Sequence, residues 1–94
     1  MKPTVLLLHG LARTQRSLDL IGKDLNHAGF PTWSETYPSR KASIEVLADE
    51  IARHVERDLP DRPLVAVTHS MGGIIARHLS TRLRLQQILM MAPP

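Results

Sequence analysis

With 94 residues, the chain can form one domain with a core of modest size. Its hydrophobic fraction of 43% is ordinary for a globular protein, and the lack of cysteine excludes a disulfide framework and a thiolate metal site. The net charge is +3, but the three arginines after residue 63 have no interleaved aromatic residues. We therefore expect a solvated helix face there and no nucleic-acid surface.

The N-terminal segment predicts neither a targeting signal nor a membrane span. The apolar run Val5–Leu8 stops at His9 and Gly10, which makes it too short for either. Together with the lack of cysteine, this favours a cytoplasmic protein.

The first 38 residues predict a strand, a helix and a second strand. The continuous apolar run Val5–His9 is typical of a strand that is buried on both faces. Apolar residues recur at helical spacing from Ser17 to Ala28, and Gly29 can end that helix. Residues Thr32–Tyr37 predict the second strand, which Pro38 ends.

The rest of the chain continues this alternation. Ser43 can cap a helix that runs to about Leu59. A third buried strand is predicted at Leu64–Thr68, a helix at about Met71–Leu83 and a fourth strand at Gln87–Ala92.

The order β-α-β-α-β-α-β predicts a single domain over residues 1–94, with a three-layer α/β/α architecture and a four-stranded parallel sheet. Ligands bind at the carboxyl ends of the strands in such sheets. The pairs His9-Gly10 and His69-Ser70 both fall at those ends.

Ser70 lies where the third strand passes directly into a helix. Such a tight turn strains the residue at its apex, and Gly72 and Gly73 leave room for the chains to approach. The Ser70 hydroxyl is then expected to project above the sheet, next to a helix N-terminus that favours negative charge.

The stretch "THSMGG" preceded by "LVAV" resembles the nucleophile elbow of α/β-hydrolase-fold enzymes. The stretch "VLLLHGL" resembles the strand and oxyanion loop upstream in the same family, and "YPSR" and "MMAPP" resemble stretches of bacterial esterase- and lipase-like members. The resemblance covers essentially all 94 residues, and it departs from G-x-S-x-G at Thr68.

This resemblance implies a serine hydrolase that acts on small-molecule carboxylic esters without a cofactor or metal. Ser70 matches the nucleophile, and the backbone N–H groups of Leu11 and Met71 match the oxyanion donors. The supporting motif residues are His9, Gly10, His69 and Gly72.

The catalytic acid and histidine that the family places after the serine are missing from the chain. No Asp or Glu follows Ser70, and His78 lies eight residues on, about 12 Å down the helix axis. His9 is expected to orient backbone, His69 to face away from Ser70, and His27 and His54 to be solvated on helices. The resemblance therefore predicts the N-terminal portion of an α/β-hydrolase fold.

The strand at 87–92 is apolar on both faces and would form a bare sheet edge. We expect it to contact either a C-terminal complement or a second copy. An alternative is a truncated, non-catalytic α/β module that associates through this edge. A flavodoxin-like phosphate binder would explain the glycine pair after Ser70 but not His9-Gly10.

Overall fold

The computed structural model describes residues 2–10, 18–37 and 43–91. Its four strands are β1 (Thr4–Leu8), β2 (Thr32–Ser34), β3 (Leu64–His69) and β4 (Leu85–Met91). They form one parallel sheet in the order β2-β1-β3-β4. The predicted four-stranded parallel sheet is confirmed, with the first and third strands at its centre.

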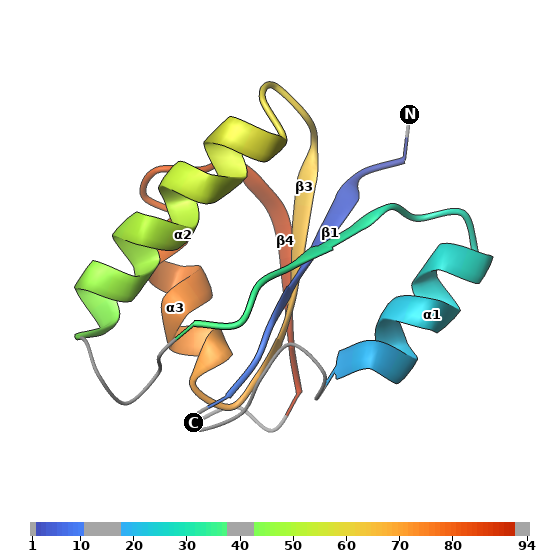
Figure 1. The fold of residues 1–94 in the computed structure, drawn as a ribbon, viewed down its shortest axis with the longest axis horizontal. Coiled ribbons are helices and arrows are strands. Elements are labelled where there is room, and N and C mark those ends of the chain that lie inside the picture. Colours follow the sequence, from blue (N-terminus) through green and yellow to red (C-terminus); the bar gives the residue numbers. More distant parts are fainter. Residues whose placement is uncertain (1, 11–17, 38–42, 92–94) are drawn as a thin grey trace.

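Three helices cover the sheet on two sides: α1 (Asp19–His27), α2 (Ile44–Asp58) and α3 (Gly72–Leu79). Helix α1 lies on one face, and α2 and α3 lie together on the other (Figure 1). This is the predicted α/β/α arrangement. Ser43 caps α2 as expected, because its hydroxyl accepts a hydrogen bond from the backbone N–H of Val46 at 3.2 Å.

The strand residues alternate between two apolar clusters. Leu6, Leu8 and Ala66 pack with α2 and α3, whereas Val5 and Val67 pack with α1. The α2–α3 cluster is the larger of the two. Strands β1 and β3 are therefore largely buried on both faces, as continuous apolar runs indicate, whereas β2 and β4 are partly exposed.

Three predicted boundaries need correction. The second strand was expected to reach Tyr37 but ends at Ser34, because Tyr37 turns away to contact His9. The third helix was expected to reach Leu83 but ends at Leu79. The hydroxyls of Ser80 and Thr81 bond to carbonyl oxygens of its last turn and satisfy them there.

The fourth strand begins at Leu85, two residues before the predicted start at Gln87. A bulge shifts its register, so that Leu64 pairs with Leu85 while Val65 pairs with Gln87. Leu85 and Ile88 consequently both pack against the α2–α3 cluster, although they are three residues apart. The predicted end at Ala92 lies outside the described residues.

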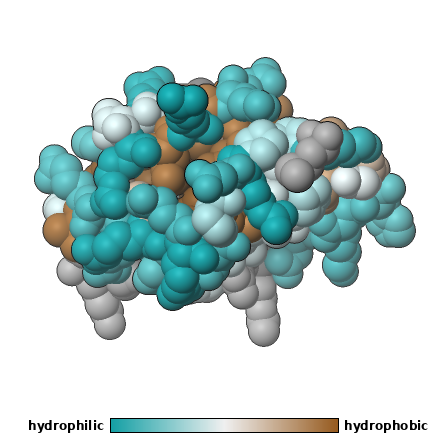
Figure 2. Space-filling view, turned by 90° about the horizontal axis from the view of Figure 1, so that it is seen from above, coloured by the Kyte–Doolittle hydropathy of each residue, from teal (hydrophilic) through white to brown (hydrophobic). Residues whose placement is uncertain are grey.

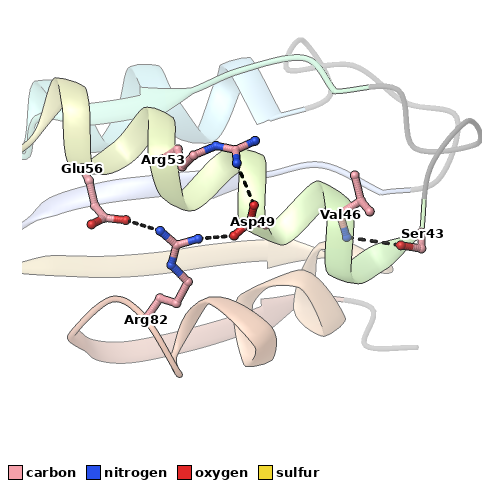
Figure 3. Close-up of polar contacts among 6 residues, drawn as sticks. All are labelled: Ser43, Val46, Asp49, Arg53, Glu56 and Arg82. Carbon is pink, nitrogen blue, oxygen red and sulfur yellow. Dashed lines mark hydrogen bonds and ion pairs between the residues drawn. The ribbon is translucent and has the colours of Figure 1, made fainter.

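Arg82, in the turn after α3, joins that turn to α2 through two acidic side chains. Its guanidinium pairs with Asp49 and, at 2.9 Å, with Glu56 (Figure 3). Asp49 also pairs with Arg53 at 2.9 Å, one helical turn along α2. All four side chains are substantially exposed, so the network contributes little stability per pair.

Strand β4 is an edge of the sheet, since it pairs only with β3 within the described ranges. Leu89, in the middle of this edge strand, is 48% exposed. None of the helices in the described ranges is long and apolar enough to cross a membrane.

Candidate active site

The turn between β3 and α3 consists of Ser70 and Met71 alone. Ser70 has φ = 53°, a left-handed conformation that is uncommon for a residue with a Cβ atom. Its N–H donates to the carbonyl oxygen of Met91 at 3.2 Å, and its own carbonyl accepts from the N–H of Gly73 at 3.0 Å. The turn is thus fixed to both β4 and α3, which holds Ser70 at its apex.

Gly72 allows the first turn of α3 to rest on the end of β1. A Cβ atom added at Gly72 would collide with the carbonyl oxygen of Leu8 and lie 2.9 Å from its carbonyl carbon. Gly73 is less restricted, since an added Cβ would lie 3.2 Å from the sulfur of Met90, a flexible side chain. Of the two glycines, Gly72 is therefore the one that the backbone packing requires.

Gly10 brings the end of β1 beside the candidate nucleophile. A Cβ atom added at Gly10 would lie 3.1 Å from Ser70 Cβ and 3.4 Å from His69 Nδ1. The predicted oxyanion segment and the elbow are therefore neighbours, although 60 residues separate them in the chain. Leu11, the predicted second oxyanion donor, lies outside the described residues.

His9 is fully buried and both of its ring nitrogens are engaged. Nδ1 lies 2.9 Å from the carbonyl oxygen of Gly10, and Nε2 lies 3.2 Å from the backbone N–H of Tyr37. These partners require a neutral ring that donates through Nδ1–H and accepts at Nε2. Burial lowers the pKa of His9, which favours the same neutral form. His9 is arranged to orient backbone, as predicted, and has no free nitrogen for proton transfer.

Tyr37 completes this arrangement, and sequence reasoning missed it. Its ring stacks on His9 with centroids 3.7 Å apart, and its hydroxyl donates to the His9 carbonyl oxygen. Burial raises the pKa of Tyr37, so its hydroxyl keeps the proton that it donates. The only sequence signal for this role is the "YPSR" stretch, which resembles bacterial lipase-like members and follows the predicted second strand.

The expectation that His69 faces away from Ser70 needs correction. Because Ser70 is left-handed, simple strand alternation stops at this point. His69 Nδ1 and Ser70 Cβ both lie close to Gly10, at 3.4 and 3.1 Å from a Cβ atom added there. His69 Nδ1 and Thr68 Oγ1 are buried without a hydrogen-bond partner among the described residues. Unpaired buried groups of this kind cost about 1–3 kcal/mol each.

The remaining described histidines lie on helices. His54 was expected to be solvated, but it is half-buried and its Nδ1 lies 2.7 Å from a carboxylate oxygen of Glu35. His27 is exposed, as predicted, and His78 is exposed as well. The described ranges contain no group of three or more side chains that could hold a metal ion.

A thioesterase domain model matches residues 29–92, a segment that includes β3, the Ser70 turn, α3 and β4. The chain belongs to the thioesterase domain family. No curated protein matches this thioesterase domain at a significant level of sequence similarity.

Several solved structures share the fold of this thioesterase domain. An extracellular α/β-hydrolase from a Paenibacillus species is 19% identical with a TM-score of 0.80, and covers 97% of this chain and 40% of its own length. A protein from Xanthomonas campestris that is assigned to the α/β-hydrolase superfamily is 14% identical with a TM-score of 0.84, with coverages of 99% and 60%. A monoacylglycerol lipase from Paleococcus ferrophilus is 23% identical with a TM-score of 0.80, with coverages of 98% and 40%.

These similarities establish the α/β-hydrolase fold that the sequence resemblance predicted. The chain spans 40–60% of the length of these three proteins. The site roles of Ser70, Leu11 and Met71 stay predictions.

Proposed function

We propose that this thioesterase domain is part of a serine hydrolase that cleaves carboxylic esters or thioesters, with Ser70 as the nucleophile. The observation that carries the proposal is the left-handed Ser70 between β3 and α3, with Gly10 against its Cβ atom. This arrangement places one alcohol beside two segments of backbone at the carboxyl ends of the strands, where ligands of such sheets bind.

In the proposed reaction, Ser70 Oγ attacks the acyl carbonyl carbon while its proton passes to a base. The carbonyl oxygen then carries the negative charge, and the N–H groups of Met71 and Leu11 stabilise it. The bond to the leaving alcohol or thiol breaks as that group takes the proton, which leaves an acyl-serine. Water then releases the acid by the same steps.

The base is proposed to come from outside these 94 residues. Both ring nitrogens of His9 are engaged, and His69 Nδ1 is buried away from solvent. No carboxylate follows Ser70 in the sequence. On this view residues 1–94 are one incomplete α/β-hydrolase domain, and a C-terminal complement supplies the acid and the histidine next to the β4 edge. The cytoplasmic location also remains a proposal.

Labelling with a fluorophosphonate probe tests the nucleophile. The 94-residue chain is incubated with the probe alone and together with the C-terminal half of a similar hydrolase, and the labelled peptide is identified by mass spectrometry. We expect label on Ser70, increased by the complement and abolished by Ser70→Ala but not by Ser80→Ala, a serine at the far end of α3. If Ser70 stays unlabelled with the complement bound, the proposal is wrong.

A second candidate is a non-catalytic module that associates through β4. The open edge of that strand and the exposed Leu89 favour it. Sedimentation separates the two candidates. A concentration-dependent dimer without any probe labelling supports the module, and a labelled chain that stays monomeric supports the enzyme.

A further inference from the structure

A hollow lies at the end of the sheet opposite Ser70. It has a volume of about 650 Å³ and is formed where α2 ends, β3 begins and the chain turns from α3 into β4. Figure 2, which looks down from the top of Figure 1, shows hydrophobic surface at the bottom of a hollow between hydrophilic side chains. Six residues of β3 separate it from Ser70, which is roughly 20 Å. It is therefore no part of the proposed active site.

The floor of this hollow is apolar. Val55 and Leu64 are buried there, Leu83 is 8% exposed, and Leu59 at the end of α2 is half-buried. A volume of several hundred Å³ over apolar side chains is typical of sites for small molecules. The floor can accept a hydrocarbon chain.

The rim carries an uneven set of charges. Arg82 is already paired with Asp49 and Glu56. Arg62 and Arg84 also line the hollow, and the side chain of neither makes a hydrogen bond or an ion pair within the described part of the chain. Asp61 is the one carboxylate on the rim that has no such partner among those residues. The unpaired charges of Arg62, Arg84 and Asp61 therefore give the rim a net positive charge.

Helix ends offer a simpler reason for cations at this place. The C-termini of α2 and α3 both point to this end of the sheet, and arginine is favourable beside them by about 0.3–1 kcal/mol. That effect explains positive charge in general. It does not explain why two unpaired guanidinium groups border one hollow with an apolar floor.

We propose that this hollow binds the carboxylate of an aliphatic acid. The chain of the acid lies on Leu59, Leu64 and Leu83, and Arg62 and Arg84 meet the carboxylate. Guanidinium groups suit this role because their fork of N–H donors matches the two carboxylate oxygens. This inference does not depend on the proposed chemistry of Ser70.

Three probes of equal chain length test the proposal: octanoate, octanol and octylammonium, each titrated into the 94-residue chain by calorimetry. We expect octanoate to bind about tenfold more tightly than octanol, and octylammonium to bind weakest. Octanoate affinity should fall by about tenfold in the double variant Arg62→Gln/Arg84→Gln, with circular dichroism to confirm the fold. Arg77→Gln, an exposed arginine of α3 outside the hollow, should leave the affinity unchanged.

The contrary results are equally specific. If octylammonium binds as well as octanoate, the helix ends dominate and the proposal is wrong. Equal binding of octanoate to the double variant and to the wild type would overturn it too. Ser70→Ala should bind octanoate normally, so a failure of the hydrolase proposal and a failure of this one give different results.

Discussion

Ser70 combines a side chain with a backbone conformation that side chains disfavour. A left-handed residue with a Cβ atom costs about 1–2 kcal/mol relative to the usual helical region. The structure fixes this conformation through hydrogen bonds to Met91 and Gly73. Strain that surrounding contacts maintain is common at functional sites, which is why Ser70 is the residue to test first.

Two replacements of Ser70, by glycine and by alanine, distinguish the cost of the backbone strain from the role of the hydroxyl group. Ser70→Gly should be more stable than Ser70→Ala by about 1 kcal/mol, because glycine adopts positive φ without strain. With the C-terminal complement present, both variants should lose fluorophosphonate labelling and any hydrolysis of a p-nitrophenyl ester. Thermal unfolding provides the stability measurement.

Asp61 provides the matched control, since it has φ = 55° in an exposed turn. Asp61→Gly should be more stable than Asp61→Ala by a similar amount, while probe labelling of Ser70 persists. Equal stabilities for the glycine and alanine variants of Ser70 would show that the turn is not strained.

His9 gives the fold a pH dependence of known sign. Its pKa is lowered in the folded state, whereas the unfolded chain titrates near the ordinary value of about 6.5. Below that pH the unfolded state takes up a proton that the folded state excludes. The free energy of unfolding should therefore fall as the pH drops below about 6.5, until the lowered pKa of the folded state is reached.

Urea unfolding at a series of pH values measures this effect. His9→Gln should flatten the slope just below pH 6.5, whatever its effect on absolute stability. A slope unchanged by His9→Gln would show that another group titrates on unfolding.

At the scale of elements, the contact between α3 and β1 decides the geometry of the site. Gly72→Ala should destabilise the fold by about 1–3 kcal/mol, because the added Cβ meets the backbone of Leu8 and that backbone cannot move aside. Gly73→Ala should cost less, since Met90 is flexible. Chemical denaturation of the two variants compares them, and equal losses would contradict the close approach of α3 to β1.

The elements themselves were largely predictable because local pattern defines them. The apolar runs at β1 and β3 and the Ser43 cap of α2 each depend on residues close in sequence. The early end of α3 depends on the neighbouring hydroxyls of Ser80 and Thr81, but the other errors arise where a distant residue decides. Tyr37 leaves the sheet for His9, which is 28 residues away, and the β4 bulge depends on its pairing with β3.

The candidate site was predictable in part for the same reason. Ser70 and Gly10 could be placed together because parallel strands end at one edge of the sheet. The stacking of Tyr37 on His9, the position of His69 beside Gly10 and the Arg82 network could not. These contacts join residues far apart in the chain, and no local period encodes them.

At the scale of the whole molecule, the open edge of β4 predicts association. Leu89→Lys should reduce any dimer or complement binding by at least about tenfold, because a charge on an edge strand opposes pairing. The monomer should keep its stability, since Leu89 is already half exposed. Sedimentation at several protein concentrations measures this, with Leu20→Lys on α1, a more exposed leucine, as control. Association that survives Leu89→Lys would have to use another surface.

The strand order β2-β1-β3-β4 also has a consequence for biosynthesis. During translation, β1 leaves the ribosome first and can pair with β2 early, but its other neighbour, β3, is made about 60 residues later. Until then one side of the most apolar strand is unpaired. We expect the nascent chain to stay unfolded, and to depend on chaperones, until β3 and α3 have both emerged.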